Sequence, residues 1–183
     1  MHSEEELIRG CCSGDRKLQR KLYDLYSKKM LVVCMRYSKA RQEAEDILQE
    51  SFIKVFNNLK NFRKESSLEF WIKKIVINTA LNSQRSKLYL YPMVDVDLIQ
   101  PAPDKEIILS DYNFQDLLKL IHSLPSGCQV VFNLHAIEGY PHKEIATMIG
   151  VSEGTVKSQY SRARSLLQNR IEELERMNYE KFK

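Results

Sequence analysis

Several features that mark common protein classes are missing from this sequence of 183 residues. Its four cysteines form no C-x-x-C pair and lie at no zinc-finger spacing from a histidine, so we expect structural or incidental thiols. No apolar run approaches the roughly 18 residues that cross a membrane, and the acidic N-terminus lacks the apolar core of a secretory signal. Nucleophile–base pairs, phosphate-binding glycine loops and carboxylate–histidine metal sets are also missing. These absences predict a cytoplasmic protein with no membrane insertion, no metal, no cofactor and no enzymatic activity.

Charge is unevenly distributed, although the formal net charge of +4 is small. Between Glu43 and Glu50 the chain carries four acidic residues and no Lys or Arg. From Lys54 to Lys87 it carries eight basic residues against two acidic ones. Adjacent surfaces of opposite sign suggest one basic and one polyanionic partner. On charge alone, two ordinary solvated helix faces are the better explanation.

Apolar residues recur at helical spacing along most of the chain. One stripe comprises Leu48, Phe52, Val55, Phe56 and Leu59, and the next comprises Leu68, Trp71, Ile72, Ile75 and Thr79. Ahead of the second stripe, Ser66-x-x-Glu69 fits a capping box. Strand-like alternation is missing apart from residues 94–97. The sequence therefore predicts an all-α fold.

The stretch from about Tyr89 to Ser110 interrupts this pattern. It holds three of the five prolines, and its four acidic residues stand against one lysine. Proline opposes helix formation, and so long a loop inside one compact domain is unusual. We therefore expect two small helical domains, residues 1–88 and 111–183, joined by an extended acidic, proline-containing linker at residues 89–110.

The second domain contains a pattern typical of a helix-turn-helix, roughly from His142 to Leu167. An apolar helix is predicted from about Cys128 to Ile137, and a second helix follows from His142. Ala146 is small where two helices cross, Gly150 suits a left-handed turn, and Ser152 can cap the next helix. Apolar residues at 145, 149, 151 and 156 would fill the wedge between the two helices.

The next helix divides into two faces. Its inward face is predicted to comprise Val156, Tyr160, Ala163 and Leu167. Its outward face comprises Lys157, Ser158, Ser161, Arg162 and Ser165, with Gln159 alongside. Small hydroxyls together with Lys, Arg and Gln can approach and read a major groove. A solvated helix could look similar, but the spacing of the small residues in the turn favours DNA binding.

At this point the sequence resembles the extracytoplasmic-function (ECF) sigma factors of bacterial RNA polymerase. The segments resembling that family's region four are Glu138–Tyr140, His142–Ala146, Gly150–Ser158 and Ser161–Arg164. Those resembling region two are Glu45–Val55 and Phe70–Ile72, with Ile75 and Asn78. The order, the spacing and the linker agree, so the resemblance covers nearly the whole chain.

The resemblance gives the acidic segment an expected role. In this family, a D-x-x-Q-E helix docks on the clamp coiled coil of core RNA polymerase, and Asp46, Gln49 and Glu50 match it here. These residues share one helix face, opposite the Phe52 stripe, and Ile53 could add an apolar anchor. Promoter DNA is the second expected partner. An anti-sigma factor is a third, because family members are commonly held by one.

The resemblance also gives the basic segment an expected role, in holding the melted upstream part of the promoter's −10 element. The family's base-capturing loop corresponds to about residues 61–67. The residues expected to contact the melted strand are Phe62, Arg63, Lys64, Lys73, Lys74 and Asn78. Trp71 shares the apolar stripe, so we favour core packing over base stacking for it.

The sequence departs from the family at two places. Ile77 stands where many members carry a basic residue, which would weaken phosphate contact from that turn. Gln159-Tyr160 stands where family members frequently have Arg-Leu, so the resemblance does not indicate which upstream (−35) promoter sequence is recognised.

Three classes of function remain in competition. The main prediction is a sigma factor that binds core polymerase, recognises the −35 and −10 elements and promotes initiation. The alternative is an autonomous helix-turn-helix regulator whose N-terminal half senses a signal or dimerises. The adjacent acidic and basic segments argue against that alternative, and an enzyme is improbable on the residues present.

Overall fold

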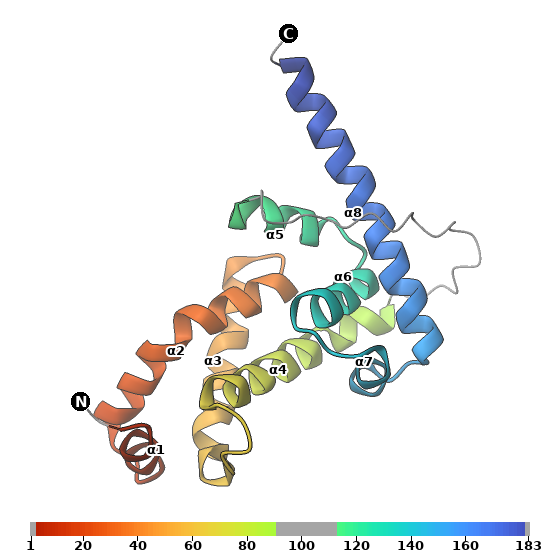
Figure 1. The fold of residues 1–183 in the computed structure, drawn as a ribbon. Coiled ribbons are helices and arrows are strands. Elements are labelled where there is room, and N and C mark those ends of the chain that lie inside the picture. Colours follow the sequence, from red (N-terminus) through yellow and green to blue (C-terminus); the bar gives the residue numbers. More distant parts are fainter. Residues whose placement is uncertain (1–2, 91–112, 182–183) are drawn as a thin grey trace. The chain divides into compact units, whose positions relative to one another are not determined.

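A computed structural model describes residues 3–90 and 113–181 (Figure 1). Every regular element in these residues is helical, as the all-α prediction required. The chain divides into two compact units, Met1–Arg85 and Ser86–Lys183. Nearly all of the predicted linker lies outside the described residues.

The N-terminal unit consists of three helices, one 3-10 turn and most of a fourth helix, which continues past the unit's boundary at Arg85. They are α1 (Glu4–Cys12), α2 (Arg16–Tyr37), α3 (Arg41–Asn58), the turn Leu59–Asn61, and α4 (Leu68–Leu90). Polar side chains cap the N-termini of the first two helices. Ser3 and Glu6 form a capping box on α1, and the Asp15 carboxylate accepts hydrogen bonds from the Lys17 and Leu18 amides at the start of α2. Helix α2 packs along α3, and α1 packs on α2 and the 3-10 turn.

The two predicted apolar stripes line much of this unit's core. Along α3 and the 3-10 turn, Leu48, Phe52, Val55 and Leu59 are buried and Phe56 is half-buried. Along α4, Leu68, Ile72 and Thr79 are buried, whereas Trp71 and Ile75 are half-buried. The buried face of α4 also includes Val76 and Ile77, each at most 1% exposed.

The start of α4 differs from the predicted capping box by one residue. Ser67, not Ser66, caps the helix: its hydroxyl accepts from the Phe70 amide at 3.2 Å. The residue three positions after this cap is therefore Phe70, whose side chain cannot accept the hydrogen bond from the Ser67 backbone amide that would complete a capping box. Glu69 instead forms an ion pair with Lys29 of α2 at 2.8 Å.

The C-terminal unit also consists of helices. They are α5 (Phe114–His122), α6 (Ser126–Phe132), a π turn (Asn133–Ile137), α7 (His142–Ile149) and α8 (Glu153–Lys181). The predicted helix from Cys128 to Ile137 thus corresponds to α6 continued by the π turn. The core of this unit is built from Leu120, Ile121, Leu124, Cys128, Phe132, Ala163 and Leu167.

The turn between α7 and α8 has the geometry expected of a helix-turn-helix. Gly150 ends α7 in the left-handed conformation, at φ +74°, which a residue with a Cβ adopts at a cost. The Ser152 hydroxyl accepts from the Thr155 amide at 3.0 Å and caps α8. Ile145 and Val156 fill the wedge at 0% exposure. The predictions that Gly150 adopts the left-handed turn and that Ser152 caps the next helix are therefore confirmed.

Candidate protein-docking and nucleic-acid interfaces

One face of α3 presents the four predicted docking residues together. Asp46, Gln49, Glu50 and Ile53 are all exposed, and Ile53 is exposed to 61%. Leu48 and Phe52 of the same helix are buried. Because this apolar stripe packs into the core, the residues on the opposite side of the helix point outward. Glu50 forms an ion pair with Lys54 at 2.6 Å, so its carboxylate is already partly neutralised.

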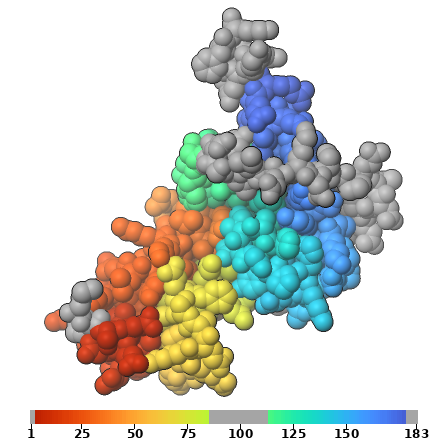
Figure 2. Space-filling model, in the orientation of Figure 1, coloured from red at the N-terminus to blue at the C-terminus, as the bar shows by residue number. Residues whose placement is uncertain are grey.

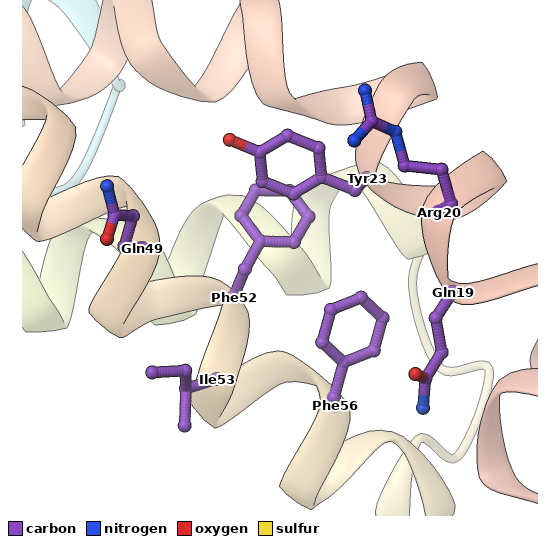
Figure 3. Close-up of a pocket in the computed structure, with 7 residues that line it drawn as sticks. All are labelled: Gln19, Arg20, Tyr23, Gln49, Phe52, Ile53 and Phe56. Atoms are coloured by element: carbon purple, nitrogen blue, oxygen red, sulfur yellow. The ribbon is translucent and has the colours of Figure 1, made fainter. Parts of the chain in front are cut away.

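A groove runs beside this face, between α2 and α3 (Figure 3). It is lined by Gln19, Arg20, Tyr23, Gln49, Phe52, Ile53 and Phe56. Tyr23 meets the Phe52 ring edge to face at 4.7 Å between centroids, which gives the groove an aromatic floor. The α2 side of this groove is absent from the sequence-based prediction, because only the tertiary fold brings α2 alongside α3.

The predicted base-capturing loop lies between the 3-10 turn and α4. Phe62 is half-buried and packs against Trp71, with 5.4 Å between ring centroids. Arg63 is exposed. Lys64 adopts a left-handed conformation, at φ +57°, and pairs with Glu5 of α1 at 2.5 Å. The Lys64 ammonium holds the pKa of the Glu5 carboxyl below its usual value.

Three further predicted contacts lie on α4. Lys74 and Asn78 are exposed, and Lys73 is half-buried. The Lys73 ammonium lies 6.0 Å from the centroid of the Phe70 ring. Ile77 is only 1% exposed, so its side chain belongs to the core of the unit and not to the surface.

Helix α8 presents most, but not all, of the predicted DNA-reading residues. Lys157 is exposed and pairs with Glu153 at 2.8 Å, while Ser158, Ser161 and Arg162 are half-buried.

The prediction for Gln159 is wrong. Gln159 is only 4% exposed, and its side-chain oxygen accepts from the Cys128 thiol at 3.0 Å. The buried face of α8 therefore runs through residues 156, 159, 163 and 167. Tyr160, predicted to point inward, is half-buried at the edge of the core.

Known proteins share both halves of this arrangement. The family model described as Sigma-70 region 2 matches residues 22–88, and that described as Sigma-70, region 4 matches residues 114–167. The ECF RNA polymerase sigma-E factor of Haemophilus influenzae is 28% identical over 94% of this chain and 97% of that relative. The Escherichia coli K12 sigma-E factor is also 28% identical, over 94% and 96%.

The chain belongs to the ECF sigma factors. Members of this family are specificity factors for transcription initiation, and the family is not one of catalytic enzymes.

Two solved structures share the fold of this sigma factor. One is the sigma factor RpoE in complex with the anti-sigma factor NepR from Bartonella quintana, with 24% identity and a TM-score of 0.53 over 84% of this chain and 96% of that one. The other is CnrH in complex with the cytosolic domain of CnrY, with 18% identity and a TM-score of 0.51 over 91% and 95%. At these identities the likeness concerns the fold alone.

Within the residues that the structure describes, no three His, Cys, Asp or Glu side chains gather where they could hold a metal ion. None of the described helices is long and apolar enough to span a membrane. Burial raises the pKa of the Cys128 thiol to about 11, with the nearby Arg162 charge acting in the opposite direction. This thiol therefore stays protonated and can donate to Gln159.

Sequence reasoning missed a cluster of rings at the entry to the sigma factor's helix-turn-helix. The His135 and His142 rings are tilted by 32° to each other with 4.1 Å between centroids, and the Tyr160 ring of α8 lies edge-on to His135 at 4.6 Å. His135 Nδ1 is 2.8 Å from the Tyr140 carbonyl oxygen. Burial lowers the pKa of His142, as do the nearby His135 and Lys157, whereas Glu153 opposes them. The cluster thus favours a neutral His142.

This cluster predicts a loss of stability in mild acid. Because the pKa of His142 is lower in the folded chain than in the unfolded one, the unfolded chain binds more protons. That difference begins below about pH 6.5, the usual value for histidine. We expect the melting temperature to fall more between pH 7.5 and pH 5.5 in the wild type than in His142→Gln. Equal falls in the two proteins would contradict the assignment.

Proposed function

We propose that this sigma factor binds core RNA polymerase through the docking face formed by Asp46, Gln49, Glu50 and Ile53 of α3. The observation that carries the proposal is that all four side chains are exposed together on one face of a rigid helix. Two carboxylates and an apolar anchor suit a basic partner surface that also offers an apolar contact. The groove lined by Arg20 and Tyr23 extends this face onto α2.

The loop and the start of α4 are proposed to hold the melted −10 strand. Arg63, Lys64, Lys73 and Lys74 supply the cations that a displaced single strand needs, and exposed Asn78 offers hydrogen bonds to a base. Phe62 is half-buried against Trp71, so less of its ring is accessible to a base than the sequence suggested.

Helix α8 is proposed to read the −35 element with Lys157, Ser158, Ser161 and Arg162. The caps at Gly150 and Ser152 fix its first turn relative to α7, which supports a preformed major-groove reader. Gln159 is excluded from this set because it is buried. Residues 1–88 and 111–183 would thus act as sigma regions 2 and 4, with residues 89–110 as the tether between them.

Partners and location complete the proposal. One fold relative was solved with an anti-sigma factor, and a partner of that class is proposed for this chain. The protein is proposed to act in the cytoplasm, where bacterial polymerase and promoter DNA are found. It carries out no reaction of its own and contributes binding alone.

Reconstituted transcription tests the proposal. Bacterial core RNA polymerase is mixed with genomic DNA fragments, with and without the purified full-length chain, and transcript starts are mapped. We expect new starts only with the chain present, each downstream of the same pair of sequence elements. Tight binding of the chain alone to duplex DNA, without any directed transcript, would instead establish the autonomous regulator.

A further inference from the structure

An ion pair joins the first helix to the loop that precedes α4. The Lys64 ammonium lies 2.5 Å from the Glu5 carboxylate of α1, so the two ends of the N-terminal unit's sequence meet here. In Figure 2 the surface of α1, coloured dark red, lies next to the yellow surface of the loop and the start of α4. The family match to region 2 covers residues 22–88, so neither that match nor the proposed function assigns a role to α1.

The Glu5–Lys64 pair is exposed and can therefore exchange partners. The Lys64 and Glu5 side chains are 54% and 66% exposed. Exposed ion pairs contribute little to stability, because water screens the attraction and two long side chains lose conformational freedom. Since burial does not lock the pair, another anion can take the place of the carboxylate beside Lys64.

The backbone at Lys64 gives a second, independent observation. Lys64 has a φ of +57°, and among the described residues it is the only one other than glycine in the left-handed region. A residue with a Cβ adopts this conformation at a cost, so contacts around it have to hold it there. The pair with Glu5 is one such contact, so α1 helps to hold the loop in its present shape.

The charge of α1 resembles that of a nucleic-acid strand. Its first turn consists of Glu4, Glu5 and Glu6. Because Lys64 holds the pKa of the Glu5 carboxyl below its usual value, Glu5 is ionised at neutral pH, as a phosphate is. Glu4 lines a groove of about 390 Å³ between α1, α2 and the start of α4, and Lys73 lines it too. The carboxylates of α1 thus lie beside two of the cations that are proposed to hold the melted strand.

We propose that Glu5 is an internal competitor for Lys64, which the melted promoter strand has to displace before the loop can bind it. The inference rests on the proposed function of the N-terminal unit and adds a restraint to it. A carboxylate and a phosphate that approach one ammonium closely repel each other, so strand binding has to break the pair. The loop therefore stays paired with α1 during chance contacts with single-stranded nucleic acid, and opens for a strand that is held at several points.

Strand binding by the holoenzyme tests the inference. Core polymerase with the full-length chain is titrated onto the fluorescently labelled non-template −10 oligonucleotide of a promoter found by reconstituted transcription. Glu5→Gln is expected to strengthen binding roughly 2- to 5-fold at low salt, because Lys64 no longer has a competing carboxylate. In a chain that carries Lys64→Gln, the same change is expected to have no effect. The gain should shrink as salt rises from about 50 mM to about 500 mM, since screening also weakens the Glu5–Lys64 pair.

Two controls separate the outcomes. Glu4→Gln removes the same charge from the same helical turn without breaking the pair, and it should change strand binding by the same small factor with and without Lys64. Core-polymerase affinity should be unaltered in every variant, which excludes a general loss of folding.

A gain in Glu5→Gln that persists in the Lys64→Gln chain would mean that α1 repels the strand as a whole, and would overturn the inference. Equal or weaker strand binding in Glu5→Gln, while the wild type directs transcription, also overturns it and leaves the proposed function intact. If the wild type directs no transcription, the proposed function fails and the inference fails with it.

Discussion

The double variant Asp46→Lys, Ile53→Ala is expected to bind core RNA polymerase about 100-fold more weakly than the wild type, or worse. Ile53 is the most exposed large apolar side chain of those described, and Asp46 lies seven residues, or two helical turns, before it on the same face. Interface residues that anchor a contact typically cost about 2 kcal/mol or more each when removed. Charge reversal at Asp46 adds repulsion against a basic partner.

Fluorescence anisotropy of the labelled chain against core polymerase measures this loss. The matched control is Leu25→Ala with Glu172→Lys, which removes an exposed apolar side chain and reverses an exposed charge away from α3. Binding to duplex −35 DNA should be the same in the wild type and the double variant, because Asp46 and Ile53 belong to the other unit. Undiminished polymerase binding in the double variant would refute the docking face, and loss of both activities would show misfolding.

Gln159→Glu is expected to lower the free energy of unfolding by about 1–3 kcal/mol near neutral pH, because it places a carboxylate in the core, where the nearby Arg162 charge offsets only part of its desolvation. Gln159 is 4% exposed and its partner is the Cys128 thiol, which supplies one hydrogen bond and no charge. Burial would raise the carboxyl's pKa in the folded chain above its unfolded value. The folded chain then binds more protons, so the variant should lose stability relative to wild type as the pH rises from 5 to 8.

Denaturant melts at several pH values test this expectation. Gln49→Glu makes the same change at an exposed site and should shift stability by no more than about 0.5 kcal/mol. Gln159→Met keeps the position neutral and should cost about 1 kcal/mol for the lost hydrogen bond. If Gln159 instead contacted DNA, Gln159→Met would alter the preferred −35 bases and leave the melts unchanged.

The exposure of Asp46 and Ile53 on one face of α3 could be predicted from sequence because its signal is local. Leu48, Phe52 and Val55 mark the buried stripe of α3, and the 3.6-residue repeat then places Asp46 and Ile53 outside. Gly150 and Ser152 were predictable for a similar reason, since a left-handed turn and a helix cap each depend on one residue and its neighbours.

The inner face of α8 was not predictable to the residue. After Val156, the helical repeat allows either the third or the fourth following residue to point inward, and hydropathy favoured Tyr160 over Gln159. The structure buries Gln159 because Cys128, 31 residues earlier on α6, donates to its amide oxygen. Tyr160 instead joins the ring cluster with His135 and His142. A polar side chain becomes a core residue when a distant element satisfies it.

The sequence by itself determined the all-α class, the exposed face of α3 that carries Asp46 and Ile53, and the turn of the helix-turn-helix, because each depends on periodicity or on the conformational preference of single residues. Only the tertiary structure decided that Glu5 of α1 pairs with Lys64, which residue of α8 turns inward, and that α2 completes the groove beside Ile53. Those outcomes depend on contacts between segments that are far apart in the chain. A local sequence pattern does not specify which side chains of different segments pack together in the core.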